Sequence, residues 1–201
     1  MQTGAAQLRI DLTDTMLGQL LDHVSLLARW NRRLNLTAIT DPVEMVVQHI
    51  LDCIAVSPLV DGERILDVGS GGGFPGIPLA VVFPDKEFVL LDSRGKRAEF
   101  LRHSVAKIGL TNTSVTKIRV EDYQPEEKFD TLVTRAFSSL EQTLSRTRAL
   151  QNPKSRLLAM KGKYPDKEIS ILPAAVRRQL TVEPMDVPFL DAKRNVVVVQ
   201  F

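Results

Sequence analysis

Hydrophobic positions recur at helical spacing in the first part of the chain. Apolar residues three or four positions apart predict an amphipathic helix over 13–33, with Thr13 as its N-cap. A second helix is predicted over 41–56, because Asp41 is a capping residue and the proline after it suits a first helical turn. We interpret these two helices as a small N-terminal helical appendage that occupies residues 1–60.

Beyond residue 60, short apolar runs alternate with helical stretches. This alternation predicts a mostly parallel sheet with right-handed crossovers and helices on both faces. The expected strands and helices lie at 64–68, 76–82, 88–91, 96–108, 113–120, 131–134, 140–150, 156–160 and 169–178. The last two apolar runs, 180–183 and 195–199, have no helical pattern between them and should pair as an antiparallel hairpin. We therefore expect an α/β domain of seven strands over 61–201.

Composition narrows the class of protein. With 44% hydrophobic and 25% charged residues among 201, the chain has the composition of a folded globular protein. Its only cysteine, Cys53, can form no disulfide within the chain, and no basic segment followed by an apolar run opens the sequence. No run of about 18 apolar residues is present. We expect a cytoplasmic monomer with no membrane contact.

A glycine-rich segment joins the first predicted strand to the helix after it. In Ile65-Leu-Asp-Val-Gly-Ser-Gly-Gly-Gly-Phe-Pro-Gly76, glycines let the backbone approach a ligand too closely for any Cβ. Asp92 ends the next strand, where its carboxylate suits the two hydroxyls of an adenosine ribose. Capping of the following helix is a second role for Asp92. Together, Gly69, Gly71 and Asp92 predict a nucleoside cofactor.

The glycine pattern does not by itself choose the nucleoside. Gly71-Gly-Gly-Phe-Pro-Gly76 also satisfies the dinucleotide pattern G-x-G-x-x-G, so a nicotinamide-dependent oxidoreductase is an alternative. Two features favour S-adenosylmethionine: the glycines begin inside the strand end, and a closing hairpin suits that class better than a dehydrogenase. We therefore favour a class I S-adenosylmethionine-dependent methyltransferase (Rossmann-like) fold. A tight turn without a ligand and a non-catalytic RNA-binding factor are further alternatives.

The segment after the fourth predicted strand bears on the methyl acceptor. It reads Thr134-Arg-Ala-Phe137, whereas methylation of an adenine amine usually requires an Asn/Asp-Pro-Pro-aromatic segment there. Carbon-5 of a pyrimidine would need a cysteine nucleophile, and Cys53 lies in the N-terminal appendage. Guanine N7 has a lone pair and no proton to lose, so its methylation needs neither that segment nor a cysteine nucleophile. Arg135 suits a guanine, a phosphate, the methionine carboxylate of the cofactor or a neighbouring acid.

Basic residues gather beside the predicted strand ends, although the net charge is only +2. Such a ring would attract a phosphate backbone, with plain surface charge as the alternative. The candidate RNA-binding residues are Arg94, Lys96, Arg97, Lys161, Lys163 and Arg194. Three arginines beside Trp30 end the first helix, where compensation of the helix dipole is an equally good explanation. The histidines have no metal-ligand spacing, so we expect no metal site.

These motifs together resemble the glucose-inhibited division protein B family, the bacterial small-subunit ribosomal RNA guanine-N7 methyltransferases. They occur in family order and at nearly family spacing. The matching segments are Trp30-Asn-Arg-Arg-Leu-Asn-Leu-Thr37, His49-Ile-Leu-Asp52, Asp67 to Leu79, Leu90-Leu-Asp-Ser93 with Gly95-Lys-Arg97, and Thr134-Arg-Ala-Phe137.

The resemblance implies a methyltransferase that uses S-adenosylmethionine to methylate N7 of one guanine in the 530 loop of 16S ribosomal RNA, near the decoding region. Its substrate would be the RNA or the small ribosomal subunit. The residues that it implies at the cofactor are Gly69, Phe74, Asp92 with the adjoining Ser93, Val120 and Glu121 at the adenine end, and Arg135. One departure is Gly-Gly-Gly-Phe at 71–74, where relatives often have Gly-Pro-Gly-Leu, which puts the stiffness of the loop in doubt.

Overall fold

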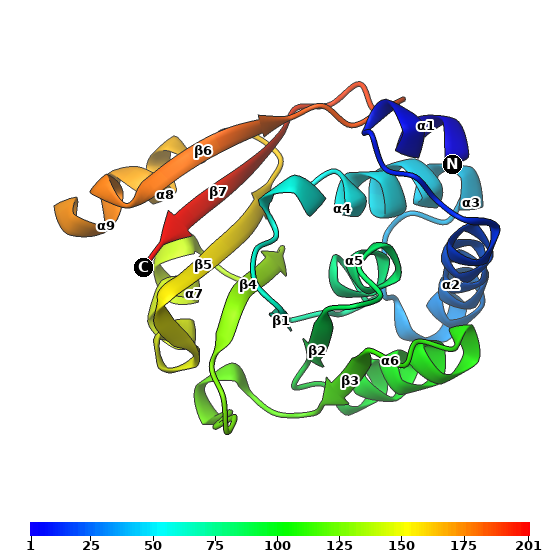
Figure 1. Ribbon diagram of the computed structural model, residues 1–201, viewed down its shortest axis with the longest axis horizontal. Helices are drawn as coiled ribbons and strands as arrows, with labels where there is room; N and C mark the ends of the chain where they lie inside the picture. Colours follow the sequence, from blue (N-terminus) through cyan, green and yellow to red (C-terminus); the bar gives the residue numbers. More distant parts are fainter.

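The structure, a computed structural model, describes all 201 residues. Seven strands form one sheet in the order β3-β2-β1-β4-β5-β7-β6 (Figure 1). Their bounds are β1 Arg64–Val68, β2 Glu87–Leu91, β3 Thr113–Thr116, β4 Phe129–Arg135, β5 Gln151–Lys161, β6 Leu180–Met185 and β7 Arg194–Gln200. β1 to β5 are parallel, and β7 is antiparallel to both β5 and β6. The strand order reverses between β1 and β4, so the carboxyl ends of these two strands are the expected ligand crevice.

Helices cover both faces of the sheet. Their bounds are α1 Gln2–Gln7, α2 Asp14–Leu34, α3 Pro42–Met45, α4 Asp52–Ile54, α5 Gly76–Val82, α6 Gly95–Ile108, α7 Leu140–Thr147, α8 Asp166–Ser170 and α9 Ala174–Arg178. Alternate strand residues face opposite sides, because successive side chains of a strand point to opposite faces. Leu66 packs in one cluster with Leu140 of α7, and Ile65 packs in another with Leu79 of α5. α5 and α7 accordingly lie on opposite sides of the sheet in Figure 1.

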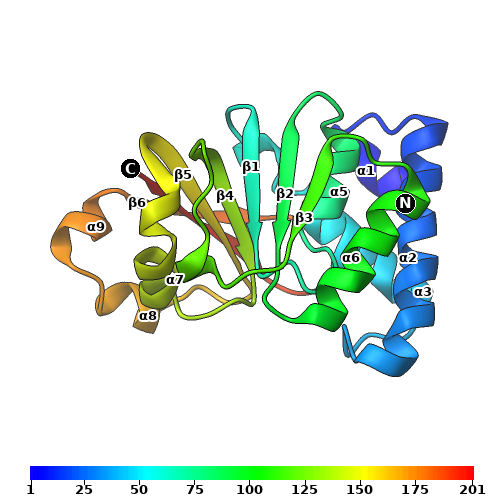
Figure 2. The same ribbon diagram turned by 90° about the horizontal axis from the view of Figure 1, so that it is seen from below.

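The N-terminal helices are packed against the rest of the chain. Leu27 of α2 and Ile54 of α4 belong to the same buried cluster as Ile77 of α5 and Phe100 of α6. Figure 2 shows α2 and α6 side by side at one end of the molecule. The helices predicted over 1–60 therefore share a core with the sheet domain, and the domain boundary near residue 60 stays a prediction.

The second predicted helix contains a π-helical turn. Asp41 caps its start by accepting from the backbone N–H groups of Val43 and Glu44, at 2.8 and 2.9 Å. The residues Val46–Leu51 are π-helical, and a short 3-10 turn follows α4. The stretch Pro42–Leu59 is apolar and long enough to cross a membrane by length and composition, but 56% of it is buried inside the protein. Such a stretch is weak evidence for a membrane-spanning helix, because the buried core helix of a globular protein meets the same criteria of length and composition.

Most predicted elements are confirmed, with shifted ends. The antiparallel hairpin of β6 and β7 is present, with Leu180 opposite Val199. β3 ends at Thr116 rather than at residue 120, because its pairing with β2 ends there. Val120 begins a separate 3-10 segment and buries its side chain. The helix expected over 169–178, with an interruption at Pro173, is present as α8 and α9, which that proline separates.

Candidate functional site

The glycine loop between β1 and α5 requires its glycines. Gly69, Gly71 and Gly73 have φ angles of +75°, +55° and +87°, in the left-handed region that other residues rarely adopt. A Cβ on Gly69 would lie 2.6 Å from Cδ2 of Phe137. The backbone N–H groups of Gly69 and Ser70 both donate to the carbonyl of Leu91, at 2.8 and 3.1 Å, which joins the loop to the end of β2.

Asp92 fastens the same loop from the end of β2. Its side chain is 5% exposed. Oδ2 accepts from the backbone N–H of Gly71 at 3.0 Å, and Oδ1 accepts from the backbone N–H of Arg94 at 2.8 Å. Arg97 lies 3.7 Å from the carboxylate. Asp92 therefore supports the turn that leads into α6, but it does not cap that helix, because the N-cap residue is Arg94 and no side chain accepts from the first turn. Asp92 also faces the pocket described next.

A first pocket of about 330 Å³ opens at the carboxyl ends of β1, β2 and β4. It is lined by Gly69, Leu91, Asp92, Ser93, Arg94, Arg97, Ile118, Arg119, Val120, Glu121, Ala136, Phe137 and Arg146. Glu121 forms an ion pair with Arg146, with 3.1 Å between Oε1 and Nε. The pocket combines carboxylates, which can accept from hydroxyl and amino groups, with apolar and aromatic side chains, against which a flat base can pack. Its volume lies in the range of small-ligand sites, roughly 300–1,000 Å³. This donor set fits an adenosine-containing ligand.

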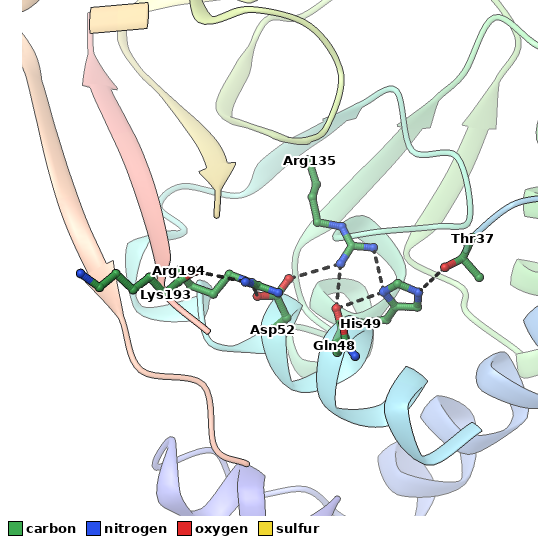
Figure 3. A network of polar contacts seen from close by, with 7 residues as sticks. All are labelled: Thr37, Gln48, His49, Asp52, Arg135, Lys193 and Arg194. Atoms are coloured by element: carbon green, nitrogen blue, oxygen red, sulfur yellow. Dashed lines mark hydrogen bonds and ion pairs between the residues drawn. The ribbon is translucent and has the colours of Figure 1, made fainter. Parts of the chain in front are cut away.

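A second pocket of about 510 Å³ adjoins the first, because Ala136 lines both. Its other lining residues are Ile39, Gln48, His49, Asp52, Arg135, Met160, Lys161, Gly162 and Arg194. They come from the ends of β4 and β5, the start of β7, the π-helical turn, the first residue of α4 and the loop before α3. Figure 3 shows five of them: Gln48, His49, Asp52, Arg135 and Arg194. The second pocket is therefore a cationic recess in which Arg135, Lys161 and Arg194 converge beside the first pocket.

Asp52 is the acidic centre of the second pocket. Its carboxylate, 5% exposed, accepts from Nε of Arg194 at 2.8 Å and from Nη1 of Arg135 at 3.3 Å (Figure 3). Nη1 of Arg135 also donates to the backbone carbonyl of Gln48 at 3.1 Å, and its guanidinium lies 4.8 Å from the centroid of the Phe74 ring. One carboxylate from α4 thus orients two arginines, one at the end of β4 and one at the start of β7.

His49 takes part in this network as a neutral side chain. Burial, with the nearby charge of Arg135, lowers the pKa of His49 to about 4. Nη2 of Arg135 lies 3.3 Å from Nδ1, and Oγ1 of Thr37 lies 2.8 Å from Nε2. Nδ1 also lies 3.0 Å from the backbone carbonyl of Gln48, which can only accept. This closer contact assigns the proton to Nδ1, and Nε2 then accepts from the hydroxyl of Thr37. At neutral pH, both ring nitrogens of His49 are engaged within the protein.

The structure gathers most of the predicted cofactor residues at the first pocket. Gly69, Asp92, Ser93, Val120 and Glu121 line it, and Gly71 contacts Asp92 through its N–H. Arg135 lines the second pocket instead, paired with an acid as one of its alternatives predicted.

Phe74 is buried and lines neither pocket. Its ring packs against the ring of His49, with 4.7 Å between the two centroids, and the guanidinium of Arg135 also lies against it. The predicted contacts of Phe74 and Arg135 with a cofactor stay predictions.

The predicted RNA-binding residues divide into three groups. Arg94 and Arg97 line the first pocket, and Lys161 and Arg194 line the second. Lys161 is paired with Glu168 at 2.9 Å. Lys96 and Lys163 are exposed and line neither pocket.

Sequence reasoning missed the roles of Gln48, His49 and Asp52. A signal was present, because an aspartate among Ile50, Leu51, Cys53 and Ile54 is a polar residue within an apolar helical run. Such a residue requires a buried partner.

No group of three or more histidine, cysteine or acidic side chains has a metal-binding arrangement.

Asp92→Ala is expected to weaken binding of S-adenosylhomocysteine, a stable probe of this pocket, by about 10- to 100-fold. The substitution removes the acceptor of two loop N–H groups, and a hydrogen bond to a charged group contributes about 1.5–3 kcal/mol. Titration calorimetry measures the affinity. Asp122→Ala is the matched control, because that carboxylate is exposed and lies just beyond the first pocket. Equal affinities of the two variants would contradict the placement of Asp92.

Stability at acid pH is expected to depend on His23. Burial lowers the pKa of His23 to about 4, although its Nε2 lies 3.0 Å from the carbonyl of Gly72 in the glycine loop. Unfolded His23 binds a proton below about pH 6.5 and folded His23 does so only near pH 4, so unfolding takes up a proton in this window. The stability of the folded state therefore falls as the pH is lowered from 6.5 toward 4.

The comparison of wild type with His23→Gln isolates this effect. Urea unfolding gives the free energy of unfolding of each protein at pH 7 and at pH 4.5. Between these two pH values, wild type should lose about 2 kcal/mol more stability than the variant. Two other groups titrate in this range and are present in both proteins. His49, whose pKa burial also lowers to about 4, acts with the same sign as His23, and Asp67, whose pKa burial raises to about 7, acts with the opposite sign. Parallel pH profiles would contradict the assignment.

Comparisons with known proteins agree with this site. The model of the family described as rRNA small subunit methyltransferase G matches residues 16–197. The chain is 47% identical over 191 residues to the ribosomal RNA small subunit methyltransferase G of Aeromonas salmonicida, covering 95% of this chain and 91% of the relative. It is 44% identical to the protein of the same name from Haemophilus influenzae, covering 97% of this chain and 96% of the relative.

Solved structures share the fold at low sequence identity. A SAM dependent methyltransferase from Aquifex aeolicus superposes with a TM-score of 0.59 at 18% identity, covering 80% of this chain and 94% of that one. A putative O-methyltransferase from Klebsiella pneumoniae gives a TM-score of 0.60 at 15% identity, covering 89% of each chain. With the glycine loop, the adenosine-fitting pocket and the near full-length match in place, the chain belongs to the rRNA small subunit methyltransferase G family.

Proposed function

We propose that this enzyme transfers a methyl group from S-adenosylmethionine to N7 of one guanine in the 530 loop of 16S ribosomal RNA. Membership of the family makes the chain an S-adenosylmethionine-dependent rRNA methyltransferase. The acceptor atom is the finer proposal. The observation that carries it is the second pocket, which is cationic and in which every candidate base is already engaged.

The second pocket offers no side chain that is ready to take a proton. Asp52 accepts from two arginines, and His49 is neutral with both ring nitrogens engaged. Cys53 is fully buried, and burial raises the pKa of its thiol far above the usual range, so it is not a nucleophile. An acceptor with a lone pair and no proton, such as guanine N7, needs none of these groups. Positioning alone then accounts for the rate enhancement.

The first pocket would hold the cofactor. When bound, S-adenosylmethionine supplies an electrophilic methyl group on a sulfonium. We assign the ribose hydroxyls to Asp92 with Ser93 beside it, and the adenine to the segment of Val120 and Glu121. Gly69 allows close approach of the ligand to the loop. The nicotinamide oxidoreductase, which the glycine pattern left open, has no support from the relatives.

Arg135, Lys161 and Arg194 would hold the target nucleotide in the second pocket. Their cationic side chains suit phosphate oxygens, and the planar fork of an arginine also suits O6 of guanine. Ala136, which lines both pockets, marks where donor and acceptor would meet. The exposed Lys96 and Lys163, with Arg94 and Arg97, would add long-range attraction for the RNA backbone.

The purified enzyme tests this proposal. It is incubated with S-adenosylmethionine and with small subunits, or their naked 16S RNA, from a strain lacking the gene. Borohydride reduction and aniline then cleave the RNA at N7-methylguanine, and primer extension locates the cleavage. One enzyme-dependent cleavage in the 530 loop is expected. A methyl group found at another atom or outside that loop would refute the proposal.

The cellular setting is also a proposal. An enzyme whose substrate is ribosomal RNA meets that substrate in the cytoplasm, and we propose that it acts there without membrane contact. We further propose a monomer. Light scattering after gel filtration should then give a mass near 22.4 kDa, and a mass near twice that value would refute it.

A further inference from the structure

The end of α2 carries a second cationic surface outside both pockets. Arg29, Trp30, Arg32, Arg33 and Leu34 line a surface hollow of about 400 Å³, which we call the α2 patch. All three arginines are exposed. None of them forms an ion pair or a side-chain hydrogen bond within the protein, whereas Arg64, Arg135, Arg146, Arg156 and Arg194 all do.

Compensation of the helix dipole does not account for the whole patch. Cations within the last turn of a helix interact with its unpaired carbonyls. Arg32 and Arg33 lie in that turn, but Arg29 lies before it. Asn35 also supplies a left-handed cap whose N–H donates to the carbonyl of Asn31 at 3.2 Å. The three arginines instead concentrate unpaired positive charge around one hollow, which is the arrangement that attracts a polyanion.

The patch is rigid and lies close to the second pocket. The ring of Trp30 packs on Phe100 and His103 of α6, with centroids 5.6 and 5.3 Å away, and fixes the end of α2. Asn31 exchanges two 2.9 Å hydrogen bonds with the backbone of Thr37. Thr37 in turn contacts His49, which lines the second pocket. Two hydrogen-bonded contacts, from Asn31 to Thr37 and from Thr37 to His49, therefore link the end of α2 to the proposed acceptor site, and Figure 3 shows the second of them.

We infer that the α2 patch binds the phosphate backbone of ribosomal RNA next to the target nucleotide, as an anchor separate from the two pockets. This inference rests on the proposed function. Arginine suits phosphate oxygens because its planar fork donates two hydrogen bonds. Trp30 and Leu34 give the hollow an apolar lining, and the three exposed arginines around it favour a polyanion over a neutral surface as the partner.

The triple variant Arg29→Gln, Arg32→Gln, Arg33→Gln tests the inference. With undermethylated small subunits as substrate, KM for the subunit should rise about 10-fold or more at physiological salt, while kcat stays within twofold of wild type. Filter binding of 16S RNA should show a salt dependence whose logarithmic slope is smaller by about 2 to 3, because each lost phosphate contact removes about 0.7–0.9. Affinity for S-adenosylhomocysteine should be unchanged, since the first pocket is intact.

Two controls separate RNA contact from general charge and from folding. Arg177→Gln, Arg178→Gln removes two cations from α9, at the opposite end of the molecule in Figures 1 and 2, and should leave KM and the salt slope unaltered. Replacing the three patch arginines with lysine keeps the charge and should restore most of the RNA affinity.

An unchanged KM and salt slope in the triple glutamine variant would overturn the inference. This result is also expected if the patch binds an acidic protein instead of RNA. A parallel loss of kcat and of cofactor affinity would overturn it too, because the arginines would then be structural. Failure of the proposed function has a different result: the wild-type enzyme would place no methyl group on the 530 loop, whereas filter binding would still report on the patch.

Discussion

Gly69→Val is expected to reduce the affinity for S-adenosylhomocysteine by more than about 100-fold. Gly69 has a φ of +75°, and a Cβ there would lie 2.6 Å from the Phe137 ring. A β-branched residue at this φ costs at least about 1–2 kcal/mol in backbone strain, and the overlap forces either the loop or Phe137 to move. Both line the first pocket, so the displacement falls on the ligand. Titration calorimetry gives the affinity, and urea unfolding gives the loss of stability.

Gly109→Val is the matched control for this variant. Gly109 ends α6 with a φ of +71°, nearly that of Gly69, but a Cβ there would meet nothing within 4 Å. The two substitutions therefore impose similar backbone strain, and only one of them disturbs the pocket. Gly109→Val should lose stability and keep its cofactor affinity. Normal affinity in Gly69→Val would show that the cofactor binds elsewhere.

Arg135→Ala is expected to lower kcat for methyl transfer by about 100-fold or more, with the fold retained. Misplacement of a reacting group by about 1 Å can cost about 100-fold in rate, and Arg135 contacts Gln48, His49, Asp52 and Phe74 around the second pocket. Asp52 keeps Arg194 as a partner in this variant, so no buried charge is left unpaired. Single-turnover assays at saturating RNA and cofactor measure the rate.

The control for Arg135 is another half-buried arginine with similar partners. Arg156 pairs with Asp61 at 3.0 Å and donates to the carbonyl of Leu59, away from both pockets. Arg156→Ala should lose a comparable amount of stability and keep its activity. Wild-type turnover in Arg135→Ala would reduce Arg135 to a structural ion pair. A fall in S-adenosylhomocysteine affinity alongside kcat would support its predicted contact with the cofactor.

The fold could be predicted from the sequence because its elements are marked locally. Thr13 and Asp41 both cap helices as expected, and the run Arg64–Val68 is a strand at its predicted bounds. Elements without such marks were missed or misjudged. α1 has no side-chain cap and only six residues. The start of β5 at Gln151 includes Pro153, a residue that favours a turn in sequence reasoning.

The candidate site could be predicted only in part, for a related reason. Gly69 and Asp92 are brought together by neighbouring parallel strands, which the alternation of elements already predicts. The second pocket instead depends on contacts between residues 83 and 142 positions apart, from Asp52 to Arg135 and to Arg194. The conformation of the glycine loop determines where the side chain of Phe74 points. That conformation cannot be predicted from the sequence, because glycines have no side chains whose pattern would indicate it.

The position of β7 has a consequence for the order in which a new chain becomes an enzyme. β7 is the last strand to be synthesised, yet it lies inside the sheet, between β5 and β6, and it carries Arg194 to Asp52. Until β7 leaves the ribosome, β5 has an unpaired edge, β6 has no strand to join, and Asp52 lacks one of its two arginines. A nascent chain therefore completes the second pocket only after all seven strands have been synthesised.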